Sequence, residues 1–286
     1  MKIKDWIRKI ALGIIHKPRQ SVVVKLVKAD YQGILTNHAI VITGGSRGIG
    51  FAIARKFADE GAKVLITGRN AESLEVACRQ IGINAKMLVQ DVSKIEDFDS
   101  FIRDCEVVLN ESVTGFVLNA GISYHEGNFL NVTQESYDQQ MNTNLRANFF
   151  IAQAFINKLI EKSKQGNILF ISSETAGKSN DLPYGLAKLA INSLVGGLAR
   201  RVYQKGIRVN AIAPGVTLTD MKKGKDLLRD DYANSSVAGR FLLPEETAEI
   251  ACFMMSDLSK CISGEIIYCD AGSHLKINGL ESEYSL

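Results

Sequence analysis

The stretch HAIVITGGSRGIGFAIARKFADEG, residues 38–61, decides the fold of this chain. Its apolar first part predicts a short buried strand that ends in glycines, and the rest has helical periodicity up to Gly61. Gly44 would allow a tight turn, Gly48 would let the backbone approach a pyrophosphate, and Gly50 would let the helix pack on the strand. The new helix would offer its free N–H groups to phosphates, although a plain tight turn is the alternative.

The same alternation of strand and helix repeats about seven times along the chain. We expect strands at 38–45, 62–69, 83–92, 113–121, 166–173, 207–215 and 264–272, and helices at 48–61, 71–82, 94–110, 133–163, 183–205 and 244–258. The strands are continuously apolar, which is typical of a parallel sheet that is buried on both faces. The prediction is an α/β fold, a single doubly wound Rossmann domain of about seven parallel strands with helices on both faces.

The predicted domain covers residues 37–275 and leaves a short segment at each end. Residues 276–286 would be a C-terminal tail, and the charged stretch 216–243 would be a substrate lid. Residues 1–36 would be an extension in which one helical face carries Ile3, Trp6, Ile7, Ile10, Ile14 and Ile15, with Lys and Arg opposite. Such a helix could contact a membrane surface weakly through residues 1–18, or pack on its own body or on a neighbouring subunit.

Charge and composition exclude several classes of protein. The net charge is +3, and residues 1–36 carry +6 (eight Lys or Arg, two Asp), so the rest carries −3 and gives no footprint for nucleic acid. Five scattered cysteines without metal-ligand spacing predict reduced thiols in a cytoplasmic protein. The four histidines are too far apart to suggest a local metal site, and no apolar run is long enough to span a bilayer.

The end of the second predicted strand indicates which dinucleotide would bind. Residues 67–70 contain no acid to accept from a ribose 2′-OH, whereas Arg69 lies there and Arg47 lies in the glycine loop. A guanidinium group matches phosphate oxygens, so two of them favour the 2′-phosphate of NADP(H). The alternative is that both arginines are solvated surface residues.

The stretch LPYGLAKLAIN, residues 182–192, places a phenol and an ammonium four residues apart. Tyr184 and Lys188 would share one helix face, and Pro183 suits the first turn of that helix. This spacing arises often by chance, so the pair gains meaning only from the other motifs of the chain.

Those motifs together resemble the short-chain dehydrogenase/reductase family from about residue 38 to residue 272. The matching elements, in the family's order, are TGGSRGIG at 43–50, Asp91-Val92, NAG at 119–121, Asn144, Ser173, Tyr184-x-x-x-Lys188 and PGVTLT at 214–219. The glycine spacing is that of the family's ordinary short branch, and the Tyr–Lys gap is shorter than that of the enoyl-acyl-carrier reductases.

The resemblance implies a catalytic role for four residues. Tyr184 would be the general acid or base, and Lys188 would lower its pKa and bind the nicotinamide ribose. Ser173 would donate to the substrate carbonyl, and Asn144 would anchor a water that links Lys188 to solvent. Asn142 lies near Asn144, and Ser172 beside Ser173; the family pattern favours the second of each pair.

The resemblance also implies the contacts of the cofactor. The glycine loop, with Gly44, Ser46, Arg47, Gly48, Ile49 and Gly50, would hold the phosphates. Asp91 and Val92 would contact adenine, and Asn119, Ala120 and Gly121 would line the adenine-side ribose. The nicotinamide end would be held by Pro214, Gly215, Thr217 and Thr219.

The family's reaction is the interconversion of a ketone and a secondary alcohol with NADP(H). A 3-oxoacyl group on a carrier protein is the expected substrate; sugar or polyketide carbonyls, or a non-catalytic NADP(H)-binding regulator, are the alternatives. The resemblance further implies a homotetramer built through the helices at 133–163 and 183–205. Residues 122–130, 174–182 and 216–243 would choose the substrate, with Tyr124 and His125 at the pocket rim.

Overall fold

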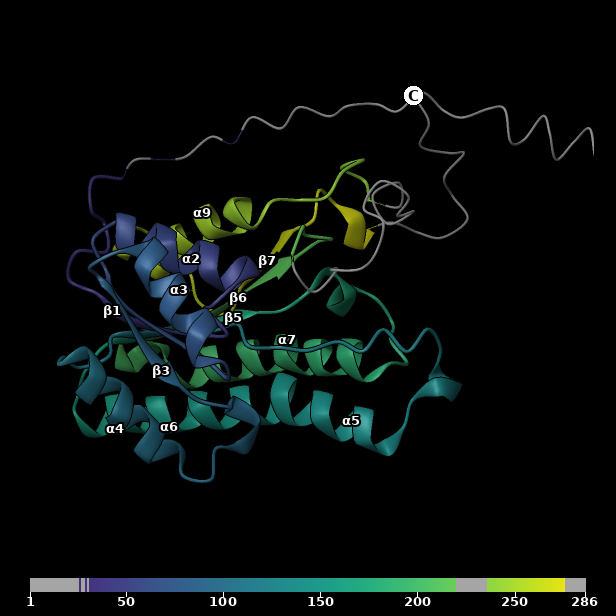
Figure 1. Ribbon diagram of the computed structural model, residues 1–286, viewed down its shortest axis with the longest axis horizontal. Helices are drawn as coiled ribbons and strands as arrows, with labels where there is room; N and C mark the ends of the chain where they lie inside the picture. Colours follow the sequence, from purple (N-terminus) through teal and green to yellow (C-terminus); the bar gives the residue numbers. More distant parts are fainter. Residues whose placement is uncertain (1–25, 27–28, 30, 220–235, 276–286) are drawn as a thin grey trace, which may run out of the picture.

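The structure, a computed structural model, describes residues 26, 29, 31–219 and 236–275. The predicted helix within 1–18, the middle of the predicted lid and the predicted tail after 275 lie outside these residues. Figure 1 shows three layers, with helices above and below one central sheet. Within the described part of the chain, no helix combines the length and apolar character needed to cross a membrane.

The sheet has seven parallel strands in the order β3-β2-β1-β4-β5-β6-β7. They are β1 (Ala39–Thr43), β2 (Lys63–Gly68), β3 (Ala85–Val89), β4 (Gly115–Leu118), β5 (Gly166–Ile171), β6 (Ile207–Pro214) and β7 (Ile266–Cys269). The strand order reverses between β1 and β4, and a doubly wound sheet binds its ligand outside the carboxyl ends of the strands at such a point. The predicted fold class is therefore confirmed. We expect the ligand site at the carboxyl ends of β1 and β4, where the strand order reverses.

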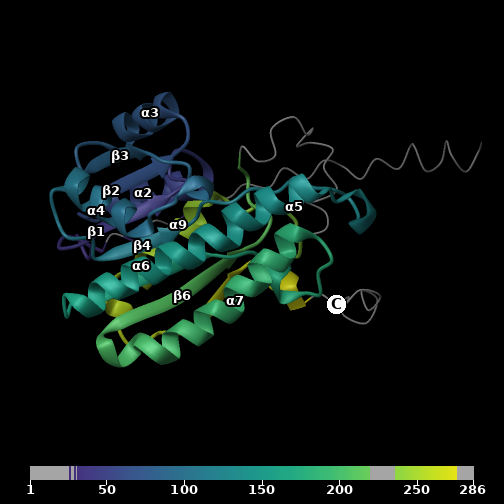
Figure 2. The same cartoon turned by 90° about the horizontal axis from the view of Figure 1, so that it is seen from below.

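The helices cover both faces of the sheet. In Figures 1 and 2, α2 and α9 lie on one face, whereas α4, α6 and α7 lie on the other. Their bounds are α2 (Gly48–Asp59), α3 (Ala71–Ile81), α4 (Phe98–Leu109), α5 (Gln134–Met141), α6 (Ala147–Glu161), α7 (Pro183–Val202) and α9 (Pro244–Met255). The predicted helix at 94–110 begins later, at Phe98, because the Asp97 carboxylate caps it by accepting from Ser100 N at 2.9 Å.

Two apolar clusters form the core, one on each side of the sheet. The first joins α4, α6 and α7 to the sheet, and in it the rings of Phe116 and Phe155 meet edge to face at 4.8 Å. The second joins α2, α3 and α9 to the opposite face and contains Phe57 and Leu74. The strands β1, β4 and β6 are buried along their whole length, as expected, but the edge strands β3 and β7 are only partly buried.

The long helix predicted at 133–163 is interrupted. A π-helical turn, η3 (Asn142–Arg146), separates α5 from α6, and Ala147 N donates to Asn142 O across it. Apolar periodicity carries no mark of such a turn, because it inserts one residue without a break in direction. The insertion turns Asn144 into the protein, where its side chain is fully buried.

The described end of the predicted extension belongs to the folded domain. Leu35 is fully buried in the second apolar cluster, and Tyr31 and Ile34 pack against that cluster. Glu60, directly after α2, accepts from Tyr31 N at 3.3 Å and from Gly33 N at 3.1 Å. The predicted domain start at residue 37 therefore lies after the first core residue, not before it.

Candidate functional site

The glycine loop between β1 and α2 forms the phosphate end of the candidate site. Gly44 and Gly48 have φ angles of +67° and +57°, a region that side chains with a Cβ rarely adopt. A Cβ at Gly50 would lie 2.5 Å from Gly44 O, so this glycine lets α2 start against the loop. Gly45, which the motif reading passed over, is also constrained: its Cβ would lie 2.6 Å from Ile66 Cγ2.

Asn119, after β4, braces this loop. Its side-chain amide donates to Thr43 O at 2.9 Å and to Gly44 O at 3.0 Å. In return, Thr43 Oγ1 accepts from Asn119 N and Ala120 N, both at 3.0 Å. The Asn119 side chain thus holds the glycine loop in shape, a role that the sequence did not reveal. Contact of residues 119–121 with a ribose stays a prediction.

The start of α2 suits an anionic ligand. Its N-cap residue, Arg47, makes no side-chain cap, and the first turn contains no acid, so the first N–H groups and the positive dipole end face outward unopposed. Arg47 and Arg69 are exposed, and neither guanidinium takes part in a salt bridge with a described carboxylate. The remaining predicted loop residues, Ser46 and Ile49, lie within the same turn.

Two further predicted cofactor contacts flank the loop. Asp91 Oδ1 accepts from Ser93 N at 3.0 Å and from Ser93 Oγ at 2.7 Å, which fixes the turn after β3 and buries Val92. Beyond β6, Thr217 Oγ1 donates to Gly215 O at 2.8 Å, and a Cβ at Gly48 would lie 3.3 Å from Thr219 Cγ2. The loop that begins at Pro214 therefore reaches the glycine loop from the other side of the site.

The two ends of the predicted lid meet beside this loop. Leu218 N donates to Leu242 O, and Leu242 N donates to Val216 O, both at 2.9 Å. A bidentate pair between Arg240 and Glu246 then ties the second end to the first turn of α9. The described ends of residues 216–243 are therefore held to the body at the site, while a lid function stays a prediction.

Lys188 lies at the centre of the site. It is 3% exposed, and its Nζ donates to Ile171 O at 2.6 Å. A Cβ at Gly121 would lie 3.2 Å from Asn144 Oδ1 and 3.7 Å from Lys188 Nζ, so the end of β4, the π turn and α7 converge here. Asn144 is held by Ile122: Asn144 Oδ1 accepts from Ile122 N and Asn144 Nδ2 donates to Ile122 O, both at 2.8 Å.

Ser173 and Tyr184 face each other across the end of β5 and the start of α7. The Ser173 hydroxyl lies close enough to the Tyr184 hydroxyl to oppose the rise of its pKa, and Ser173 Oγ accepts from Thr175 Oγ1 at 3.0 Å. Lys188 Nζ lies 5.7 Å from the centre of the Tyr184 ring. The structure thus brings together all four predicted catalytic residues: Asn144, Ser173, Tyr184 and Lys188. The neighbouring Ser172 turns away, because its hydroxyl donates to Asn192 Oδ1 at 2.6 Å.

Burial dominates the protonation equilibria of the site. Burial raises the pKa of Tyr184 above its usual value, the hydrogen bond with Ser173 opposes this, and the charge of Glu174 adds to it. Burial lowers the pKa of Lys188 to about 8. The expected lowering of the Tyr184 pKa involves the positive charge of the oxidised nicotinamide as well as Lys188, and it stays a prediction for the enzyme with its cofactor bound.

Two asparagines near the site were missed from the sequence. Asn192 follows Lys188 by four residues and so extends the Tyr184–Lys188 face of α7, a periodicity that could have revealed it. Asn148 Nδ2 donates to Asn144 O at 2.8 Å and supports the π turn, while its Oδ1 is buried without a partner among the described residues. No sequence pattern marked Asn148, because its role depends on the π turn.

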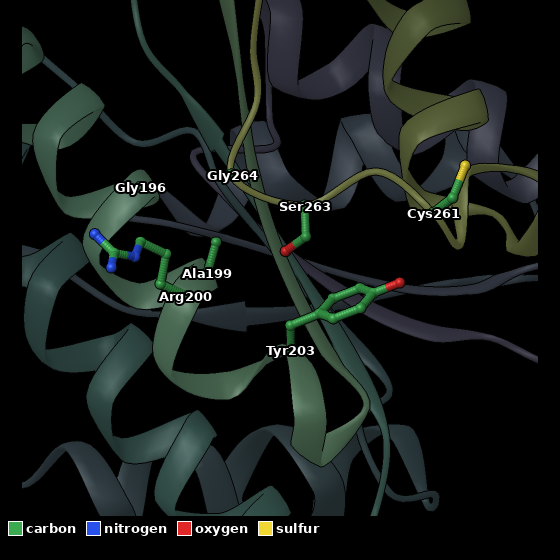
Figure 3. A pocket seen from close by; sticks show the side chains of 7 residues that line it. All are labelled: Gly196, Ala199, Arg200, Tyr203, Cys261, Ser263 and Gly264. Atoms are coloured by element: carbon green, nitrogen blue, oxygen red, sulfur yellow. The ribbon is translucent and has the colours of Figure 1, made fainter.

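An open pocket of about 440 Å³ lies at the other end of α7. Figure 3 shows Tyr203 below Ser263, with Arg200 and Cys261 on either side of it. These residues belong to the last turns of α7 and to the loop before β7, at the amino ends of the strands. The pocket is therefore separate from Ser173 and Tyr184, which lie at the carboxyl ends.

Side chains suited to metal binding do not gather in the described part of the chain. No group of three or more His, Cys, Asp or Glu residues there could hold an ion. All five cysteines, which lie in that part, are free thiols.

The fold and these side chains define an α/β protein with a glycine-rich loop where the strand order of its sheet reverses and a Tyr–Lys pair on one helix. Residues 44–274 match the family model described as enoyl-(acyl carrier protein) reductase. The 3-oxoacyl-(acyl-carrier-protein) reductase of Chlamydia trachomatis is 35% identical over 247 residues, covering 84% of this chain and 98% of the relative. A protein of Rattus norvegicus named dehydrogenase/reductase SDR family member 6 is 33% identical over 253 residues, with the same coverage.

A comparison with solved structures finds the same kind of relative. The crystal structure of a 3-ketoacyl-(acyl-carrier-protein) reductase from Brucella melitensis, complexed with NADH, superposes with a TM-score of 0.76 at 28% identity and covers 84% of this chain and 99% of its own. The chain belongs to the short-chain dehydrogenase/reductase family. It is a ketoreductase-type oxidoreductase similar to the 3-oxoacyl-(acyl-carrier-protein) reductases.

Proposed function

We propose that this enzyme reduces the ketone of a 3-oxoacyl group, carried on a carrier protein, to a secondary alcohol with NADPH. The observation that carries the proposal is the convergence of the Ser173 and Tyr184 hydroxyls beside buried Lys188. Two hydroxyl groups that lie next to each other can both reach one carbonyl oxygen, which is the geometry that carbonyl reduction requires.

The chain's own residues divide the work of the reaction. Ser173 donates to the substrate carbonyl oxygen and orients it, and Tyr184 delivers the proton to that oxygen. Tyr184 is protonated before the reaction, as a proton donor must be, but its raised pKa also makes it a weaker acid, which the positive charge of an oxidised nicotinamide would offset. The pKa of Lys188, about 8, lies near neutrality. Lys188 can therefore return a proton toward Tyr184 through the ribose hydroxyl groups of the bound cofactor.

The residues present fit a nicotinamide dinucleotide. The uncapped start of α2 and the positive φ angles of Gly44 and Gly48 make a cradle for a pyrophosphate, and the 214–219 loop closes its other side. When bound, this cofactor supplies the hydride, while the protein supplies orientation and the proton.

The preference for NADP(H) rests on Arg47 and Arg69. Both are exposed beside the predicted ribose position, and neither is neutralised by a described carboxylate. A 2′-phosphate would pair with them, whereas a 2′-OH would leave two cations without a partner. The Brucella relative was crystallised with NADH, which lacks the 2′-phosphate, so the preference for NADP(H) has to be measured in the present chain.

The decisive experiment compares the parent enzyme with Tyr184→Phe. NADPH oxidation is followed with 3-oxoacyl, sugar and polyketide-like ketones, and Tyr184→Phe should lower kcat/KM by about 10²-fold or more. Tyr203→Phe is the matched control, because Tyr203 is exposed at the far end of α7 and should change nothing. If no ketone is reduced although NADPH binds tightly, the protein is a regulator and the proposal fails.

We also propose that the protein is a cytoplasmic homotetramer that assembles through α6 and α7. Both helices expose large apolar side chains, namely Phe149, Ile160, Leu186 and Leu189, which a subunit interface would cover. Sedimentation of the parent and of Leu189→Glu tests this, because a charge in the interface should release smaller species.

The weak membrane contact expected for residues 1–18 is tested by vesicle binding before and after their removal.

A further inference from the structure

The chain after β7 folds into a compact structure, residues 270–275, which we call the C-terminal turn. Asp270 organises it although its side chain is only 1% exposed: Oδ1 accepts from Gly272 N at 2.9 Å and Oδ2 accepts from His274 N at 2.7 Å. His274 Nδ1 donates to the same Oδ2 at 2.8 Å. A buried carboxylate with three donors fixes both the backbone and the imidazole of this turn.

The C-terminal turn touches three segments that border the site. A Cβ at Gly177, in the short helix η4 (Glu174–Gly177) that directly follows Ser173, would lie 3.0 Å from His274 Cβ. A Cβ at Gly215 would lie 2.9 Å from Asp270 Cα. Val237 N, in the second end of the predicted lid, donates to Ser273 Oγ at 3.2 Å. The turn therefore spaces these three segments relative to one another.

A second chain of contacts links the turn to α7. The His274 ring stacks on Tyr268 with ring centres 3.8 Å apart and planes 15° from parallel. Tyr268 OH accepts from Asn192 Nδ2 at 3.4 Å, and Asn192 Oδ1 accepts from Ser172 Oγ at 2.6 Å. In Figure 2 the yellow C-terminal segment lies at the same end of the molecule as the beginning of α7.

We propose that Asp270 and His274 are positioning residues that set the substrate entrance. Their pair fixes the C-terminal turn, and the turn holds η4, the 214–219 loop and the lid end at defined distances around Ser173 and Tyr184. The inference rests on the proposed function, since it assumes that the substrate carbonyl lies between those two hydroxyls. Neither residue touches the reacting atoms, so their contribution falls on substrate binding and not on the proton transfer itself.

Kinetics separate this role from a merely structural one. His274→Leu removes the donor to Asp270 but keeps a side chain of similar bulk; it should raise KM for the ketone about tenfold, with kcat and the Kd of NADPH within about threefold of the parent. His274→Gln keeps a donor and should recover most of the loss. Leu275→Gln, at a 71% exposed position of the same turn, is the matched control and should leave KM unchanged.

Amide hydrogen exchange gives a reading that does not depend on turnover. His274→Leu should speed exchange severalfold in residues 174–178 and 236–242, where Lys178 N and Leu242 N are hydrogen-bonded, and leave α2 unchanged. Faster exchange spread over the sheet, or unchanged exchange in these two segments, overturns the proposal. An unchanged KM in His274→Leu also overturns the proposal, and the proposed function still stands if Tyr184→Phe abolishes ketone reduction. If Tyr184→Phe reduces ketones as fast as the parent enzyme, the proposed function is wrong, whatever His274→Leu does.

Discussion

Two buried lysines, on opposite faces of the sheet, are treated in opposite ways by the protein. Lys56 on α2 is 9% exposed, and its Nζ contacts Glu60 Oε1 at 2.9 Å, Glu249 Oε2 at 3.1 Å and Ala29 O at 2.5 Å. Lys188 on α7 is 3% exposed, and among the described residues its Nζ has one hydrogen-bond partner, the neutral carbonyl of Ile171.

Their pKa values follow these surroundings. Burial alone would lower the pKa of Lys56, but the hydrogen bonds and charges of Glu60 and Glu249 raise it above its usual value. Burial lowers the pKa of Lys188 to about 8, and no carboxylate opposes this. An ammonium group with two carboxylates holds the fold together, whereas one kept without a carboxylate costs stability and is retained for chemistry.

The largest expected effect is on activity. Lys188→Met should lower kcat/KM by about 10²-fold or more, because the site loses its only described ammonium group beside Tyr184. Lys56→Met should leave kcat/KM within about threefold of the parent, because Lys56 lies on the other face of the sheet. Steady-state NADPH oxidation measures both, and equal losses would break the comparison.

Stability should respond in the reverse order. Lys56→Met leaves the buried carboxylate of Glu60 and the partly buried carboxylate of Glu249 without this cation and should destabilise the fold by about 3 kcal/mol at pH 7. The pKa of Glu60 is lowered: burial is the largest single influence and opposes this, but the hydrogen bonds from Lys56, Gly33 N and Tyr31 N and the charge of Lys56 together outweigh it. The stability it contributes is therefore present above its unfolded pKa of about 4.5 and is lost as pH falls through the folded value.

Urea unfolding at pH 7 and at pH 4 tests this dependence. The penalty of Lys56→Met should shrink at pH 4, and Lys56→Met combined with Glu60→Gln should lose less than Lys56→Met alone. A penalty that is the same at both pH values would mean that packing, and not charge, makes Lys56 important.

Lys188→Met should stabilise the fold by about 1 to 3 kcal/mol at pH 7, since it removes the cost of a buried ammonium group. The folded pKa of about 8 lies below the unfolded value of 10.5, so the folded state releases its proton first as pH rises. The parent therefore gains stability between about pH 8 and pH 10.5, and the advantage of Lys188→Met should shrink over that range. Unfolding curves at pH 7 and pH 10 provide the measurement.

The smallest effect concerns cations that are not buried. Arg47→Ala and Arg69→Ala should each weaken NADPH binding by about tenfold and NADH binding by less than about twofold, without changing stability. Fluorescence titration of both dinucleotides measures the affinities. Equal losses for NADPH and NADH would mean that neither arginine reads the 2′-phosphate.

Local patterns predicted the fold well, and they pointed to four candidate catalytic residues that the structure brings together. The glycines at 44, 48 and 50 and the spacing of Tyr184 and Lys188 are written within one strand–turn–helix unit or one helix turn, so sequence periodicity reveals them. The π turn was missed because a single inserted residue leaves the apolar pattern intact. The contacts of Lys56 and His274 were missed because their partners come together only through the tertiary fold.

The effect of burial on Tyr184 and Lys188 is a property of the site that the sequence could not show. Residue spacing shows that Lys188 is near, but it does not show that both groups are desolvated together. In the folded protein, burial acts on the phenol and on the ammonium group at once, and it disfavours the charged form of each.

The segment that precedes β1 determines where the chain can be shortened. Lys56 donates to Ala29 O, and Glu60 accepts from Tyr31 N and Gly33 N. Leu35, in the same segment, is fully buried in the core. A variant that begins at residue 26 keeps all of these groups, whereas one that begins at residue 37, where the sequence pattern places the domain start, uncovers an ion cluster and an apolar cavity. The second should therefore melt well below the first, which thermal unfolding of the two variants measures.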